Sequence, residues 1–130
     1  MEGGDFMTRM EALALAIART NDWLEPDSLA FSLGNPGLLK AFKLTQSMDA
    51  NQYRIFESSM DGLQALIFDL QTKCSGHSRS KLKLDSTLTD LMAVYGHPVA
   101  STGAIVKFLR KALRDSSVAD KTPLSFFLPE

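Results

Sequence analysis

The chain has 130 residues, of which 45% are hydrophobic and 22% are charged, and these proportions are ordinary for one globular domain with its own core. Its formal net charge of −1 excludes a global electrostatic attraction to nucleic acid or to an anionic membrane. Cys74 is the only cysteine, which excludes an intramolecular disulfide and a thiolate-rich zinc site. We expect a single domain over residues 1–130, with residues 1–7 flexible and no bound cofactor.

The N-terminal stretch MEGGDFMTRM contains neither a basic n-region nor an uninterrupted apolar h-region. No later stretch is long and apolar enough to span a bilayer. The sequence therefore predicts a chain without its own export signal, which is cytoplasmic or is released by a phage-type route.

The first helix is predicted to begin after Thr8, because Thr8 and Glu11 have the spacing of a capping box. The apolar residues that follow recur at three- and four-residue steps, so they share one helix face. Asn21 stands one turn beyond Ile17 and is expected to end this apolar stripe.

Two prolines and two glycines interrupt residues 23–40, which predicts a long connection rather than a regular helix. Long ordered connections of this kind are often functional. Residues 53–56 alternate enough for a short strand, and this strand could pair with residues 38–42 in a small hairpin.

Three further core helices are predicted. A serine at position 58 or 59 can cap one that runs to about Cys74, and one of residues 85–87 can cap the next. The last begins near Ser101 or Thr102. The apolar tail, residues 123–130, is expected to pack back on the body. The sequence thus predicts a mainly α or α+β domain of about four core helices, with a loop-rich segment or small β-hairpin after the first.

Four motifs occur in a definite order along the chain. The first helix reads ALAIART, an Asn-Pro-Gly turn occupies residues 35–37, the next helix opens with FESSMDGLQA at residues 56–65, and TLTDLMAVYGHP follows at residues 87–98. In this order and spacing, over about residues 10–113, the chain resembles the lysozyme-like superfamily, in particular small lytic transglycosylases and phage muramidases.

The resemblance implies a lysozyme-like fold and cleavage of the β-1,4 link between N-acetylmuramic acid and N-acetylglucosamine in peptidoglycan. It also implies a glutamate near the end of the first helix that acts as general acid, a role that requires a carboxyl kept protonated by its surroundings. The position that matches this glutamate is Asn21, and an asparagine amide has no acid proton to donate. The resemblance therefore implies a possible pseudoenzyme, with weak or no hydrolysis and at most glycan binding.

Two neighbouring carboxyl groups are candidates for a replacement acid. Asp22 follows Asn21 directly, but one helical step rotates its side chain by ~100° away from the Asn21 direction. Glu25 lies just past the helix end, beside Pro26, where the loop could turn it inward. Both residue types are more often solvated surface groups. An active muramidase or transglycosylase that uses Glu25 or Asp22 is the alternative prediction.

The groove is expected between the first helix and residues 31–56, and four side chains are predicted to contact the glycan there. Aromatic faces pack on pyranose rings, which favours a role of the aromatic side chains in sugar binding. The same aromatic residues could equally be part of the hydrophobic core. The Asn-Pro-Gly turn could equally serve loop geometry alone. The predicted substrate-binding residues are Trp23, Asn35, Tyr53 and Tyr95.

The sequence also bears on binding to nucleic acid, metal ions and other proteins. Lys73, Arg79, Lys81 and Lys83 form a basic stretch without interleaved aromatic residues, so an exposed loop is favoured over a nucleic-acid site. The two histidines are too isolated from other ligand residues to predict a metal. The predicted partner is peptidoglycan or a related amino-sugar glycan, with no nucleic acid and no membrane. A third hypothesis is a structural or interaction module of a phage or secretion apparatus, which binds a protein partner and keeps the fold as a relic.

Overall fold

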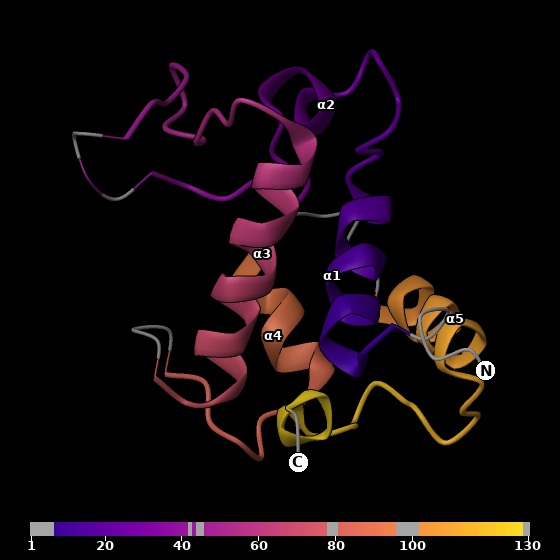
Figure 1. Cartoon of the computed structure of the whole chain (residues 1–130). Helices are drawn as coiled ribbons and strands as arrows, with labels where there is room; N and C mark the ends of the chain where they lie inside the picture. The colour runs from indigo at the N-terminus through magenta and orange to yellow at the C-terminus, as the bar shows by residue number, and fades with distance from the viewer. Residues whose placement is uncertain (1–6, 42, 44–45, 78–80, 96–101, 129–130) are drawn as a thin grey trace.

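The structure is a computed structural model that describes residues 7–41, 43, 46–77, 81–95 and 102–128. These residues form five α-helices and a short 3-10 helix, and no strand is assigned among them. The mainly α class predicted from the sequence is therefore confirmed. The elements, shown in Figure 1, are α1 (Arg9–Thr20), α2 (Leu29–Leu33), α3 (Ser59–Cys74), α4 (Leu88–Tyr95), α5 (Thr102–Leu113) and η2 (Leu124–Phe127).

Helix α1 is the centre of the domain. Its capping box is present as predicted, because the Thr8 hydroxyl accepts the Glu11 N–H at 3.0 Å and the Glu11 carboxylate accepts the Thr8 N–H at 2.8 Å. Figure 1 shows α1 between α3 and α5, and it packs against both of them and against η2. The helix ends at Asn21, as predicted.

Helix α3 forms the second wall of the core. The Ser58 hydroxyl caps it by accepting the Asp61 N–H at 3.1 Å, and the helix reaches Cys74, both as predicted. Cys74 is fully buried, and desolvation raises the pKa of its thiol to about 12. A thiol that stays protonated at neutral pH is unreactive, so Cys74 is a core residue.

The connection between α1 and α3 contains one element that the sequence did not reveal. Residues 29–33 form α2, a five-residue helix within the connection that the sequence predicted. The Ser28 hydroxyl caps α2 by accepting the Phe31 N–H at 3.0 Å, and Gly34 ends it with a φ of 61° in the left-handed region. Five residues are too few to show a helical repeat, which is why the pattern did not predict it.

The predicted hairpin is present only as isolated bridges. Lys40 pairs with Tyr53, and Met48 pairs with Arg54, both antiparallel. The Arg54 N–H donates to the Leu39 carbonyl at 2.9 Å. The two segments therefore lie side by side as predicted, but within the described residues their pairing is too short to count as a strand.

The C-terminal part closes the core. Thr87 and Asp90 bond each other's backbone N–H groups at the start of α4, which confirms the predicted cap. Leu124 and Phe127 of η2 are buried, so the tail packs on the body as expected. Arg79 of the predicted basic stretch and His97 lie outside the described residues.

Candidate functional site

The end of α1, the Asn-Pro-Gly turn and the start of α3 meet at one place, which we call the loop junction and define as Asn21, residues 34–37 and Gly62. Asn21 ends α1 with only 8% of its surface exposed. Its side-chain Nδ2 donates to the Pro36 carbonyl at 2.9 Å. Asn21, which the resemblance in sequence would align with a general acid, is thus a buried hydrogen-bond donor that holds the loop.

The glycines of the junction allow the loop to lie directly against α3. A Cβ added to Gly62 would stand 2.0 Å from the Gly34 carbonyl oxygen and 2.7 Å from Pro36 Cδ. A Cβ on Gly37 would stand 2.6 Å from the Leu66 Cδ1 atom. Gly62 is therefore in backbone contact with Gly34, and Gly37 packs directly against the Leu66 side chain, which explains the glycine in each motif.

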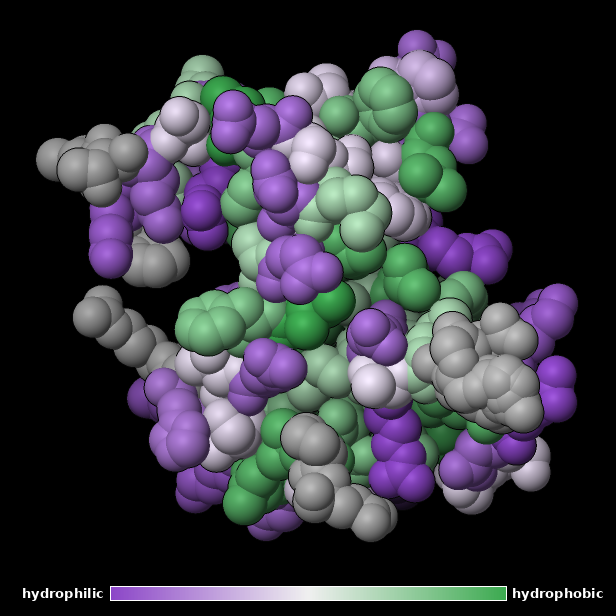
Figure 2. Space-filling model, viewed as in Figure 1, coloured by the Kyte–Doolittle hydropathy of each residue, from purple (hydrophilic) through white to green (hydrophobic). Residues whose placement is uncertain are grey.

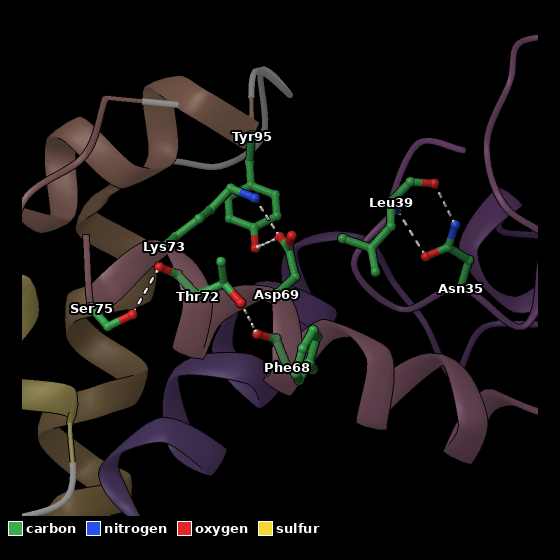
Figure 3. Close-up of polar contacts among 8 residues, drawn as sticks. All are labelled: Asn35, Leu39, Phe68, Asp69, Thr72, Lys73, Ser75 and Tyr95. Carbon is green, nitrogen blue, oxygen red and sulfur yellow. Dashed lines mark hydrogen bonds and ion pairs between the residues drawn. The ribbon is translucent and has the colours of Figure 1, made fainter. Parts of the chain in front are cut away.

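Asn35 is fully buried, and its amide is occupied by the backbone. Its Oδ1 accepts the Leu39 N–H at 2.9 Å, while its Nδ2 donates to the carbonyl oxygens of Leu39 at 3.0 Å and Arg54 at 2.9 Å. Figure 3 shows the two bonds to Leu39. Asn35 thereby ties the two paired segments of the connection together.

The two candidate replacement acids are on the surface. Asp22 has a φ of 55° in the turn after α1, and Glu25 follows one turn later, with its N–H donating to the Asp22 carbonyl at 2.9 Å. Both side chains are exposed, whereas Trp23 between them is half-buried and packs on the core. These three residues do not line the groove described next.

A groove of about 480 Å³ runs between the connection and the two helices α3 and α4. Figure 2 shows a notch on this side of the molecule, beneath the loop segment at upper left. This groove lies against α3 and α4. The groove expected between the first helix and residues 31–56 stays a prediction. Its lining residues are Leu38, Leu39, Lys40, Arg54, Ala65, Phe68, Asp69, Thr72, Lys73, Val94 and Tyr95.

The helix wall of the groove is apolar and aromatic. Phe68 on α3 is 70% exposed and Val94 on α4 is 40% exposed, which are high values for large apolar side chains. Tyr95 is half-buried beside them. Exposed aromatic surface in a concave site is typical of ligand binding.

A polar network joins α3 to α4 within the same wall (Figure 3). The Asp69 carboxylate accepts a hydrogen bond from the Tyr95 hydroxyl at 2.7 Å and from the Lys73 ammonium at 2.6 Å. Burial and the neighbouring Asp69 charge raise the pKa of Tyr95 well above its ordinary value. Asp69 is therefore held as a paired hydrogen-bond acceptor.

The loop wall of the groove carries two cations. Lys40 donates to the Asn51 carbonyl at 3.0 Å, and its ammonium lies 4.2 Å from the centroid of the Tyr53 ring. The Arg54 guanidinium lies 4.4 Å from the centroid of the Phe56 ring. Each cation is thus placed against an aromatic face that orients it.

Of the predicted site residues, Tyr95 lines the groove and Tyr53 contacts it through Lys40. The sequence did not single out Phe68, Lys40 or Arg54. Phe68 could have been found from the repeat of α3, because the buried stripe of Leu63, Leu66 and Leu70 leaves position 68 on the other side of the helix.

Comparison of the chain with protein-family models, with curated proteins and with solved structures found no match. In the part of the chain that the structure describes, no group of three or more His, Cys, Asp or Glu side chains is placed to hold a metal ion. Across the same described residues, no helix has the length and apolarity needed to cross a membrane.

Proposed function

We propose that the protein is a lysozyme-like domain that binds an amino-sugar glycan, such as peptidoglycan, in the groove without cleaving it. One observation carries the proposal: a groove with an exposed aromatic wall and a polar, cationic wall, whose lining holds a single carboxyl group that is already paired. The motifs quoted from the sequence supply the family expectation.

The composition of the groove suits a sugar chain. Pyranose rings present apolar C–H faces, which pack on aromatic side chains such as Phe68 and Tyr95, and polar edges, which bond to groups such as Thr72. A volume of about 480 Å³ is within the range of small-ligand sites and fits a few sugar residues of a longer chain.

The absence of cleavage follows from the carboxyl groups. Glycoside hydrolysis generally requires a pair of carboxyl groups that flank the scissile bond, one of them protonated. Among the described residues, the only carboxyl group of the groove lining is that of Asp69, which is bonded to an ammonium and a phenol, while Asn21 is buried against Pro36. None of the lining groups that the structure describes can therefore act as the protonated acid.

The binding proposal is tested by calorimetric titration with a hexamer of N-acetylglucosamine and by co-sedimentation with insoluble peptidoglycan. Phe68→Ala should weaken binding by about tenfold, because it removes the most exposed aromatic face of the groove. The matched control is Phe31→Ala, which removes an exposed phenylalanine of α2 that does not line the groove and should leave the affinity unchanged. Equal binding by both variants, or no binding by the parent, contradicts the proposal.

The catalytic alternative is tested by the clearing of peptidoglycan suspensions and the release of soluble muropeptides. We expect no clearing by the parent, and none by Asn21→Glu, because position 21 faces Pro36 rather than the groove. Clearing by the parent that is lost in Glu25→Gln or Asp22→Asn would establish the alternative reading, in which one of these carboxyl groups replaces the acid.

A second candidate function, a structural or interaction module of a phage or secretion apparatus, is favoured by a separate observation. Leu24, Leu29 and Phe31 are exposed around α2, and Figure 2 shows apolar groups interleaved with hydrophilic ones in this part of the molecule. A photo-crosslinker at position 29 would test it in the cells of origin. Crosslinks from position 29 to one defined protein, together with an empty glycan titration, would favour this function over glycan binding.

A further inference from the structure

The charges that line the groove differ from those of the whole chain. The formal net charge of the chain is −1, yet the lining contains the cations Lys40, Arg54 and Lys73 against the single carboxylate Asp69. The groove is therefore a local concentration of positive charge on a chain that is slightly negative overall. Such an excess attracts anionic groups of a ligand.

The charges on the helix wall compensate each other. Lys73 Nζ lies 2.6 Å from Asp69 Oδ2, and the pair sits one helical turn apart on α3. The Tyr95 hydroxyl gives Asp69 a second hydrogen bond. The excess positive charge of the groove thus resides on the loop wall.

The positive charges of Lys40 and Arg54 are not compensated by a carboxylate among the described residues, because their contacts are with a carbonyl oxygen and with aromatic rings. Lys40 bonds the Asn51 carbonyl and lies over the Tyr53 ring, while Arg54 lies over the Phe56 ring. Contacts of this kind hold a cation in one region and leave N–H donors for a ligand.

The backbone beneath these two cations is fixed. Lys40 is bridged to Tyr53, and the Arg54 N–H donates to the Leu39 carbonyl at 2.9 Å. The buried Asn35 amide adds a bond from its Nδ2 to the Arg54 carbonyl. The two cations are thus presented by a braced part of the connection rather than by a free loop.

We infer that the groove selects glycans that carry carboxylate groups over neutral amino-sugar chains, and that Lys40 and Arg54 determine this selection. The inference rests on the proposed function, since the aromatic wall is taken to hold the sugar rings. The ligand class is an amino-sugar chain with carboxylates, which a lactyl ether on the sugar or an attached peptide can supply. Arginine and lysine are the side chains that pair with such groups.

The test compares three probes by calorimetry: a neutral N-acetylglucosamine hexamer, an alternating N-acetylglucosamine and N-acetylmuramic acid hexamer without peptide, and the same alternating hexamer with its peptides. The parent should bind the carboxylated hexamers about fivefold to tenfold more tightly than the neutral one. The preference should shrink when the salt concentration rises from about 50 mM to about 500 mM, since exposed charges are screened. A preference for both carboxylated probes supports the inference with the lactyl carboxylate as the source, and one that appears only with peptides supports it with the peptide carboxylates as the source.

Substitutions test whether Lys40 and Arg54 cause the preference for carboxylated hexamers. Lys40→Met and Arg54→Met should each lower the ratio of the affinity for the carboxylated hexamers to the affinity for the neutral hexamer, and the double variant should bring this ratio to about one. Lys107→Met is the matched control, since Lys107 is exposed on α5 outside the groove, and it should keep the preference. Thermal melting checks folding, and Lys40→Met by itself suffices if Arg54→Met unfolds, because the Lys40 side chain is exposed.

The outcomes separate the two proposals. Equal affinity for neutral and carboxylated hexamers overturns the selection and leaves glycan binding intact. A preference that survives in the folded Lys40→Met variant and in the double variant also overturns it. Binding of none of the three probes overturns the proposed function itself, and the selection with it.

Discussion

The loop junction and the groove both include residues of the connection between α1 and α3. The asparagine side chains of the junction bond to the protein backbone, whereas the groove has exposed side chains that can contact a ligand. In the junction, the Asn21 and Asn35 amides are buried and bonded to the backbone. In the groove, Phe68 is largely exposed and Lys40 is on the surface. The Asn-Pro-Gly turn and Gly62 lie in the junction and serve the folding of the chain, whereas Phe68, Lys40 and Arg54 of the groove lie outside the motifs quoted from the sequence.

Gly62→Ala gives the sharpest test of the junction and should have the largest effect on stability. Its Cβ would stand 2.0 Å from the Gly34 carbonyl oxygen, a backbone atom that can move only if the loop leaves α3. We expect the free energy of unfolding to fall by about 4 kcal/mol, as for severe overpacking.

The measurement is chemical denaturation, with Gly103→Ala as the matched control. Gly103 is exposed within α5, where alanine is a better helix former, so this control should be neutral or slightly stabilising. A Gly62→Ala variant as stable as the parent would show that the loop does not press against α3 as the structure has it.

Asn35→Ala should have the next largest effect, because one side chain carries three hydrogen bonds to the backbone. Its loss leaves polar groups of Leu39 and Arg54 without their partner. We expect a destabilisation of about 3 kcal/mol by denaturation. Glycan affinity should also fall in the folded fraction, since Leu39 and Arg54 line the groove.

The control for Asn35 is Asn51→Ala. Asn51 is exposed on the same connection and uses only its backbone in the hydrogen bonds of the described structure. It should be neutral. If Asn35→Ala is no worse than this control, the junction does not brace the groove.

Asn21→Asp tests why an amide, rather than a carboxyl group, occupies position 21. A neutral carboxyl can still donate to the Pro36 carbonyl, but a carboxylate cannot, and both burial and that carbonyl raise the pKa of the introduced group. A pKa raised by folding gives stability that is present below the unfolded value and is lost as the pH rises through the folded value.

The variant should therefore match the parent at about pH 3.5 and be less stable by about 2 kcal/mol at pH 7. Melting temperatures across this range check it, with Asn51→Asp as the exposed control. A difference from the parent that does not grow with pH would place the Asn21 side chain elsewhere than against Pro36.

The elements were largely predictable because their signals are local. The Thr8 and Glu11 capping box and the Ser58 cap follow from side chains within a turn of the backbone groups that they bond. The mainly helical class followed from the repeat of apolar residues. Helix α2 was missed because it is shorter than two turns.

The groove was not predictable in the same way because it joins distant segments. Arg54 and Phe68 line one space only because the connection folds back beside α3. For Asn35, the sequence could not show whether the side chain binds a ligand or bonds the backbone of its own loop, since an Asn-Pro-Gly turn is compatible with both roles. Burial supplies the distinction, and burial depends on Gly62, which lies 27 positions further along the chain.

Tyr95→Phe should have the smallest effect, and it separates the ring of the groove wall from its hydroxyl. Loss of the bond to Asp69, which keeps its contact with Lys73, should cost about 1 kcal/mol near neutral pH. Glycan affinity should stay unchanged, because the ring remains. Tyr53→Phe is the control, since the Tyr53 hydroxyl forms no hydrogen bond within the described part of the chain.

The difference in stability between the parent and Tyr95→Phe should also depend on pH. Folding raises the pKa of Tyr95 well above 10.0, the ordinary value for a tyrosine, mainly through burial and then through Asp69. The unfolded phenol therefore ionises first, and the parent loses stability as the pH rises above that value, whereas the variant has no phenol there to ionise. The difference should narrow above about pH 10 and then reverse. A difference that stays constant up to about pH 11 would mean that Tyr95 is open to water, and the polar network would then be part of the ligand surface rather than its support.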